Sequence, residues 1–223
     1  MAAYEHFEHS LAAARSLTDM YLELRRSRNL GRRGRLTPAN EDLLWLPRSA
    51  VVAAISALDA YVHSVVADQL PHALTADPAP DALCDAMAKI FPIKNGDGFR
   101  KALPMILHAN AALQLAKQLN EEVLSYASFQ APEKLQEAYA LIGHANVFDT
   151  VAEQWPGPNT APNDLKRGLA NYVKRRNQIA HEGDREANGS VRHMAPVYSM
   201  NCSNFVESLV TRLNRTVYGQ PNA

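Results

Sequence analysis

An arginine, an amide and a histidine occur within six residues near the carboxyl end of the chain. They are Arg176, Asn177 and His181. Histidine can move protons near neutral pH, and arginine stays charged and presents a fork of donors that matches phosphate oxygens. The amide of Asn177 could orient either a ring nitrogen or a ligand oxygen. These residue types suit phosphate chemistry. Because no carboxylate cluster surrounds them in the sequence, a metal is not obviously required.

The same residues also fit the end of an ordinary helix, where cations are favoured and His181 could simply cap the last carbonyls. Successive helical residues are about 100° apart, so Asn177 and His181 share a face, whereas Arg176 and His181 are roughly 140° apart. One continuous helix would therefore not aim Arg176 and His181 at the same atom. They can converge if the last turn unwinds or if a second chain supplies the missing partner. This favours a site at a helix end, at a dimer interface, or both.

The helix that must position these residues is predicted over 163–183. Asn163 is a good N-cap, and Gly183 is the natural residue just beyond the carboxyl end, so the helix should end near His181 or Glu182. Between these ends, apolar residues recur at steps of three, four and six, which keeps one stripe apolar. They are Leu165, Leu169, Tyr172, Val173 and Ile179.

The segment Arg176-Asn177-x-x-x-His181 resembles the R-x(4–6)-H motif of the HEPN superfamily. Two further segments resemble its RiboL-PSP-like branch: residues 179–183, Ile-Ala-His-Glu-Gly, and residues 57–61, Ala-Leu-Asp-Ala-Tyr, in an earlier helix. The order of helices, with the motif late and one long helix after it, adds to the likeness. A bare arginine and histidine at this spacing occur by chance in many chains. The longer segment, residues 176–183 in a predicted helix, is more specific for the family.

The resemblance implies an endoribonuclease that needs neither a metal nor a cofactor and works as a homodimer whose two motifs face one cleft. Arg176, His181 and Asn177 would be catalytic, with Asp59 and Glu182 in supporting positions. Cleavage through the 2′-hydroxyl of RNA needs both a base and an acid, and each chain offers one strong proton-transfer group, so two copies of His181 would supply the pair. DNA lacks this nucleophile and should not be cut.

Arginines are dense directly after the first predicted helix, with six in eleven residues: Arg25, Arg26, Arg28, Arg32, Arg33 and Arg35. Most charge runs are solvated, mobile loops. The alternative is an arm that grips phosphates, and no aromatic residues interleave to indicate base stacking. If RNA is the substrate, the predicted phosphate contacts are Arg32, Arg33, Arg35, Lys174 and Arg175.

The rest of the chain predicts an all-α fold. The core helix is expected over 36–70, with its most apolar part from Arg48 to Leu70, and a closing helix is expected over 198–218. The first helix is expected from Tyr4 to Leu30, and the three prolines between Pro71 and Pro80 indicate a loop. No strand alternation occurs. Residues 1–223 are therefore predicted to form a single HEPN-like domain, a bundle of about eight helices.

Composition sets limits on partners and location. The 223 residues have a formal net charge of zero, so any binding of RNA must use local patches instead of a global field. Cys84 and Cys202 fit no metal or redox spacing, which favours free thiols in a reducing compartment. No apolar run is expected to span a bilayer, and no secretory segment is visible. A cytoplasmic protein without membrane partners is expected. His6 and His9 in the first helix indicate an exposed polar turn more than a metal site.

Two other functions remain open. The chain could be a catalytically silent interaction or RNA-binding module that dimerises through the same helices, or an enzyme acting on a small phosphorylated metabolite, which needs a closed pocket. Burial of His181 discriminates between them, because a sealed ring favours the silent module and an open basic groove favours the nuclease. By analogy alone, proteins of this type often serve in toxin–antitoxin or phage-defence systems, which would require an antitoxin or inhibitor protein.

Overall fold

The computed structural model describes residues 2–31, 36–91, 93, 95–156 and 160–219. Over these residues the helices in chain order are α1 (Ala2–Ser27), η1 (Pro38–Leu44, a 3₁₀ helix), α2 (Trp45–Leu74), α3 (Asp81–Ile90), α4 (Gly96–Ile106), α5 (Ala111–Glu122), η2 (Leu124–Tyr126, also 3₁₀), α6 (Pro132–Leu141), α7 (Val147–Glu153), α8 (Pro162–Glu182) and α9 (Pro196–Tyr218). The prediction of an all-α bundle is confirmed for the described chain, which has nine α-helices where about eight were expected.

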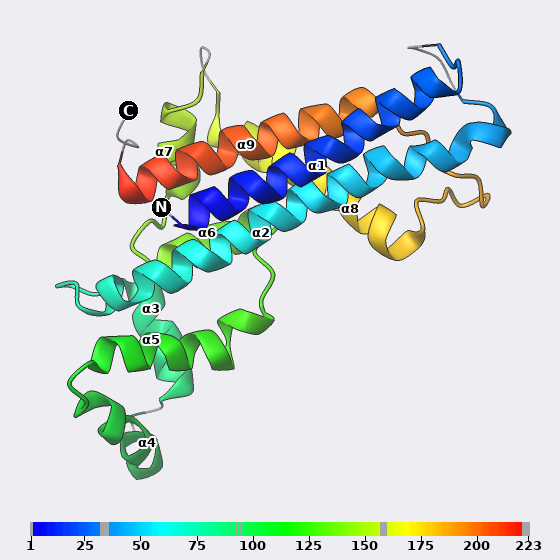
Figure 1. The fold of residues 1–223 in the computed structure, drawn as a ribbon. Coiled ribbons are helices and arrows are strands. Elements are labelled where there is room, and N and C mark those ends of the chain that lie inside the picture. Colours follow the sequence, from blue (N-terminus) through cyan, green and yellow to red (C-terminus); the bar gives the residue numbers. More distant parts are fainter. Residues whose placement is uncertain (1, 32–35, 92, 94, 157–159, 220–223) are drawn as a thin grey trace.

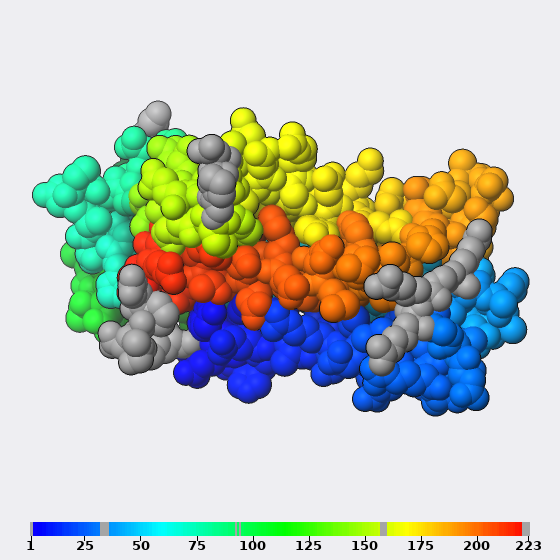
Figure 2. Space-filling view, turned by 90° about the horizontal axis from the view of Figure 1, so that it is seen from above, coloured from blue at the N-terminus to red at the C-terminus, as the bar shows by residue number. Residues whose placement is uncertain are grey.

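Helix α2 lies at the centre of the bundle. Its side chains are apolar around most of the helix, and such a helix is stable only where other helices cover it. Helices α1, α5, α6, α8 and α9 all pack against it. Figure 1 shows α1 and α9 running alongside α2, with α8 behind them. Seen from above, α9 lies between α1 and α8 (Figure 2). Tyr172 of α8 packs against Phe205 of α9, with ring centroids 5.4 Å apart.

The stretch 38–74 is long and apolar enough to span a membrane by length and composition, contrary to the expectation from the sequence. More than half of its most apolar window is nevertheless buried inside the protein. Residues such as Val51, Ile55, Leu58 and Val62 are fully covered by neighbouring helices. The apolar character of α2 is accounted for by its central place in the core and does not indicate a membrane protein.

The bounds of several helices differ from the predicted ones. The range 36–70 divides into η1 and α2, and α2 continues through Pro71 to Leu74. The loop that was predicted to begin at Pro71 therefore begins four residues later, at Thr75. Pro71 lies in the last turn of α2, so the N–H that it lacks costs the helix a single backbone bond close to its end. The Thr75 hydroxyl donates to the carbonyls of Pro71 and His72 at that end. The first helix ends at Ser27 and not at Leu30, since Asn29 has a φ of +54°, outside the helical region.

Helices α3, α4 and α5 form an arm that projects from the long helices (Figure 1). Helix α3 packs against α6 and α5, and α4 packs against α5. An apolar cavity of about 580 Å³ lies inside the arm, lined by residues that include Leu83, Met87, Phe91 and Ile106. The arm is on the opposite side of α2 from α9, so it does not interrupt the packing of α1, α2 and α9.

Both cysteines are free thiols, with Cys84 exposed and Cys202 buried in α9. Burial raises the pKa of the Cys202 thiol to about 12. The thiol therefore stays neutral at physiological pH and serves as a small apolar side chain in the core.

Candidate active site

Helix α8 carries the motif residues and is continuous to Glu182. It ends at Gly183, whose φ of +61° is in the left-handed region that favours glycine. The predicted carboxyl end is thus confirmed. Because the last turn does not unwind, Arg176 and His181 remain on different sides of one helix, and one chain does not direct both at a single atom.

The amino end of α8 begins differently from the prediction. Asn163 does not cap the helix, because the capping position is taken by Ala161 and no side chain caps the first turn. Pro162 occupies the start of the helix instead, where its fixed φ suits the helix and its missing N–H is not needed. The helix is then held by three buried side chains, Leu165, Leu169 and Ile179.

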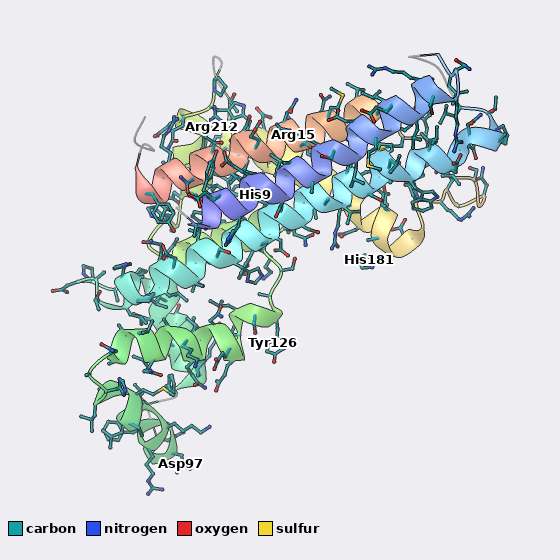
Figure 3. The ribbon with its side chains drawn as sticks, in the orientation of Figure 1. His9, Arg15, Asp97, Tyr126, His181 and Arg212 are labelled. Carbon is teal, nitrogen blue, oxygen red and sulfur yellow. The ribbon has the colours of Figure 1, made fainter. Side chains whose placement is uncertain are left out.

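His181 lies at the end of α8 with its ring exposed to solvent. Figure 3 shows its side chain directed away from the long helices. No hydrogen bond or ion pair to this ring occurs among the residues that the structure describes. The neighbouring Arg176 is partly buried, and its Nη1 donates to Oδ1 of Asn177 at 3.0 Å. Of the three predicted catalytic residues, Arg176 and Asn177 are therefore joined directly, and His181 is free to meet a ligand.

A groove of about 340 Å³ lies between α8 and the start of α6. It brings together three of the predicted site residues, Lys174, Asn177 and Glu182. Its other wall is formed by Ala131, Pro132 and Glu133, and its lining is completed by Ala170, Val173 and Gln178. Arg176 and His181 do not line it. The groove thus follows the Asn177 face of α8 and ends one residue beyond His181.

Asp59 of α2 holds the segment that leads into this wall. Its carboxylate accepts a hydrogen bond from the backbone N–H of Phe129 at 2.7 Å and one from Nε2 of Gln130 at 3.0 Å. His63, one turn later, lies 3.2 Å from the carbonyl oxygen of Ala127 through its Nε2. Asp59 has no hydrogen bond or ion pair with Arg176 or His181 within the described chain. Its support of the site is indirect, through the position of residues 131–133.

We expect Asp59→Ala to lower the free energy of unfolding by about 1–3 kcal/mol, because it leaves a buried N–H and a buried amide without their acceptor. Urea denaturation of the variant and the wild type measures the difference. The matched control is Asp19→Ala, since Asp19 is exposed on α1. An equal effect of the two substitutions would show that the Asp59 hydrogen bonds do not stabilise the fold.

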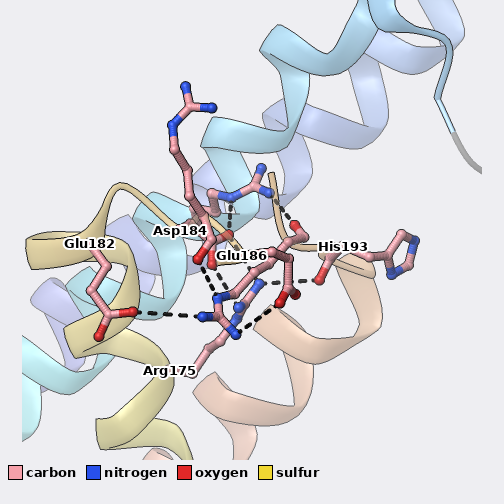
Figure 4. Close-up of polar contacts among 8 residues, drawn as sticks. Arg175, Glu182, Asp184, Glu186 and His193 are labelled. Carbon is pink, nitrogen blue, oxygen red and sulfur yellow. Dashed lines mark hydrogen bonds and ion pairs between the residues drawn. The ribbon is translucent and has the colours of Figure 1, made fainter. Parts of the chain in front are cut away.

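Arg175 turns inward, although it was predicted to contact RNA phosphates. Its Nη1 lies 2.6 Å from Oδ1 of Asp184, and its Nη2 donates to the carbonyl oxygen of His193 at 3.1 Å. Only 14% of its side chain is exposed. Burial lowers the pKa of the Arg175 guanidinium, and the nearby Asp184 carboxylate opposes that shift. Arg175 is thus occupied within the protein (Figure 4).

Asp184 also forms an ion pair with Arg48, which lies at the start of α2. Both side chains are almost completely buried, with 1% of Arg48 and none of Asp184 exposed. Nη2 of Arg48 donates to the carbonyl oxygen of Arg192 at 2.6 Å. One carboxylate therefore joins two guanidiniums from α2 and α8 beneath the chain that follows the motif.

Residues 184–195, which we call the return loop, lead from α8 to α9. The loop is fixed by backbone hydrogen bonds, among them Arg192 N–H to the Asp184 carbonyl at 2.8 Å. The Arg192 guanidinium lies 3.8 Å from the Glu182 carboxylate and 3.6 Å from that of Glu186. Glu182, predicted as a supporting residue, thus pairs with the return loop beside His181 (Figure 4).

The model of the RiboL-PSP-HEPN family matches residues 22–218 of the 223-residue chain. The chain belongs to the RiboL-PSP-HEPN family. The match includes α2, α8, the return loop and all of α9. Comparisons with curated proteins and with solved structures found no match. Membership of the family indicates a function of the RNase or RNA-binding type.

The arginine-rich segment of this HEPN chain is partly used by the fold. Nη1 of Arg25 donates to the Tyr21 hydroxyl at 3.0 Å, and Arg28 pairs with Asp42 at 2.9 Å. Arg32, Arg33 and Arg35 lie outside the described residues, so their phosphate contacts stay predictions. Lys174 is exposed and lines the groove along α8.

The first turns of α1 contain the histidines and glutamates that were considered as a metal site in the sequence. His6 and His9 are exposed there, and Nδ1 of His9 lies 2.9 Å from the Glu5 carbonyl oxygen. Among the described residues of this HEPN chain, no group of three or more histidine, cysteine, aspartate or glutamate side chains is placed to hold a metal ion.

Arg48 and Asp184 of this HEPN chain were not among the predicted site residues. A signal was present for each. Arg48 is a charged residue at the start of the most apolar helix, where an arginine is rarely buried without a partner. Asp184 follows the glycine that ends the motif helix, and a short polar side chain tolerates the left-handed conformation there. Nothing in the sequence indicates that the two lie together, because they are 136 positions apart.

Proposed function

We propose that this RiboL-PSP-HEPN chain is a metal-independent endoribonuclease that cleaves RNA through its 2′-hydroxyl. The observation that carries the proposal is the state of His181, an exposed imidazole on an ordered helix end with no polar partner in the described chain. An imidazole that only capped the helix or filled the core would be bonded or covered. An exposed one can exchange protons with a substrate near neutral pH.

The proposed reaction begins when His181 takes the proton from the 2′-hydroxyl of the substrate. The 2′-oxygen attacks the adjacent phosphorus, and the bond from phosphorus to the 5′-oxygen of the next nucleotide breaks. The departing 5′-oxygen receives a proton from a second imidazole. The products are a 2′,3′-cyclic phosphate and a free 5′-hydroxyl. Arg176 stabilises the charge that develops on the phosphoryl oxygens, and Asn177, which accepts a hydrogen bond from Arg176, holds that guanidinium in position.

A homodimer is part of the proposal because the reaction needs two proton-transfer groups, whereas the motif of one chain supplies a single histidine, His181. The continuous helix α8 also keeps Arg176 and His181 of one chain roughly 140° apart. A twofold axis near the end of α8 would bring the His181 rings of two copies to one scissile phosphate, and each could then meet the Arg176 of the other. RNA would enter along the groove that Lys174 and Asn177 line.

The biological setting that we propose is cytoplasmic, in a toxin–antitoxin or phage-defence system. It rests on analogy with the family. The activity of a nuclease that needs no metal or cofactor cannot be limited by withholding one. An antitoxin or inhibitor protein is therefore the expected partner. DNA and membranes are not expected partners.

The test is incubation of the purified protein with total RNA in excess chelator, followed by mapping of the cut ends. Cyclic phosphates at the 3′ ends and hydroxyls at the 5′ ends support the proposal, with single-stranded DNA of a cleaved sequence as the uncut control. Cleavage that chelator abolishes contradicts the metal-free mechanism. RNA binding without any cleavage supports the alternative, a silent RNA-binding module. That alternative is favoured by one observation, the absence of Arg176 and His181 from the groove lining.

A further inference from the structure

A carboxylate buried between two arginines lies three residues beyond His181. We propose that Asp184 is a positioning residue of the site. Together with Arg48 and Arg175 it fixes the end of α8 and so determines where the His181 imidazole lies. The kinetic part of this inference rests on the proposed ribonuclease function. The structural part, the effect on His181, does not.

The charged side chains of this cluster are buried, so their mutual pairing is required and is not a chance contact at the surface. No part of the Asp184 side chain and 1% of that of Arg48 is exposed. Moving such charges out of water is costly unless they are paired and their remaining hydrogen-bonding groups are satisfied. Here the remaining donors of the two guanidiniums reach carbonyl oxygens of the return loop, Arg48 to Arg192 and Arg175 to His193. Loss of Asp184 would leave both guanidiniums without the carboxylate that they share, and loss of either arginine would remove one of the two ion pairs of Asp184.

The backbone at Asp184 provides the link to the helix end. Gly183 and Asp184 both have positive φ, +61° and +56°. Glycine adopts this region freely, whereas for Asp184 it is an uncommon conformation that aspartate tolerates better than most residues and that its surroundings stabilise. The N–H of Asp184 also donates to the Gln178 carbonyl at 3.0 Å, which closes the last turn of α8. The ion-pair cluster thus holds the turn, and the turn holds the helical residues that include His181.

The return loop applies a second constraint on the other side of the turn. Arg192 donates its N–H to the Asp184 carbonyl and pairs with Glu182, the residue next to His181. Helix ends otherwise fray by one or two residues. A displacement of about 1 Å at a reacting group can reduce a rate by about a hundredfold. An anchored helix end is therefore what a histidine with no bond of its own requires.

The test uses Arg48→Lys, because Arg48 is too deeply buried to touch RNA and lysine keeps the positive charge while losing the fork that joins Asp184 to the Arg192 carbonyl. We expect kcat to fall by about ten- to a hundredfold, with KM within about twofold of wild type. In NMR spectra the imidazole signals of His181, assigned by their absence from His181→Ala, should shift or broaden. Asp184→Asn, which keeps the size and tolerates the left-handed conformation, should give the same pattern.

Two controls separate positioning from lost stability. Val66→Ala removes buried volume from the same helix α2, roughly 27 Å along its axis from Arg48. Arg15→Lys alters the ion pair with Glu207, 2.6 Å in length, that joins α1 to α9. Both should lower the melting temperature without changing kcat per folded molecule or the His181 signals. If Arg48→Lys does not fold, Arg175→Lys takes its place, since Arg175 lies at the edge of the cluster.

The inference is overturned if the cluster variants lower the melting temperature but keep the kcat and the His181 signals of the wild type. It is also overturned if they raise KM with kcat unchanged, which would indicate an RNA contact at Arg175. Should the wild type fail to cleave RNA, the proposed function falls while the NMR comparison still decides whether Asp184 positions His181.

Discussion

Replacement of His181 by alanine should abolish cleavage of RNA and leave the fold unchanged. The imidazole is the proposed base on one subunit and the proposed acid on the other, and a positioned proton-transfer group typically contributes about 10²–10⁴-fold to a rate. Because both copies are lost together, we expect a loss at the upper end of that range. The ring is exposed and has no bond within the described chain, so the melting temperature should not change. Initial rates in chelator and thermal unfolding measure the two effects.

His6→Ala is the matched control for this substitution, because His6 is also an exposed histidine on a helix but lies on α1, away from the motif. It should cleave RNA at the wild-type rate. If His181→Ala retains a rate within about threefold of His6→Ala, the imidazole takes no part in the reaction, and any cleavage by the wild type must be assigned to other groups.

Arg176→Ala should lower kcat by about 10²–10³-fold, as expected when one donor to a developing oxyanion is removed. Arg176→Lys should recover little of this loss, since an ammonium lacks the planar fork that contacts two phosphate oxygens and Asn177 together. Asn177→Ala should have a smaller effect, because Asn177 acts through the hydrogen bond that it accepts from Arg176. Steady-state kinetics on a defined RNA oligonucleotide measure all three.

Arg100→Ala is the control for charge, because Arg100 is a highly exposed arginine on α4 that pairs, within the described chain, with the similarly exposed Asp97. It should leave both kcat and KM unchanged. A wild-type kcat for Arg176→Ala, combined with a raised KM, would instead assign Arg176 to ground-state binding of RNA and remove it from the transition state.

Much of the fold could be predicted from apolar periodicity and end signals. The spacing of Leu165, Leu169 and Ile179 indicates one buried stripe, and Gly183 marks the end of that helix, as the structure confirms. The continuation of α2 through Pro71 could not be predicted from the local sequence, because a proline favours a helix end while the last turn is held by packing, with Leu70 and Ala73 buried in the core. Local rules thus fail where packing against distant residues outweighs one lost backbone bond.

The site was less predictable than the fold, because residue type does not indicate which way a side chain faces. Arg175 and Arg176 are adjacent and chemically identical, but they differ by about 100° around the helix. One therefore enters the buried cluster with Asp184, and the other meets Asn177. Asp59 was placed near the motif by resemblance, while its bonds go to Phe129 and Gln130, 70 and 71 positions away. Such long-range pairs cannot be read from spacing along the chain.

The most direct test of the central claim uses an RNA oligonucleotide with one mapped cleavage bond and a twin in which the 2′-hydroxyl at that bond is replaced by hydrogen. Both are incubated with the wild-type protein in excess chelator, and the products are separated by size. Attack by the 2′-oxygen predicts that the RNA is cut to a cyclic phosphate while the twin stays intact at that bond. Equal cleavage of both would mean that another nucleophile is used, and the roles given to His181 and Arg176 would then be wrong.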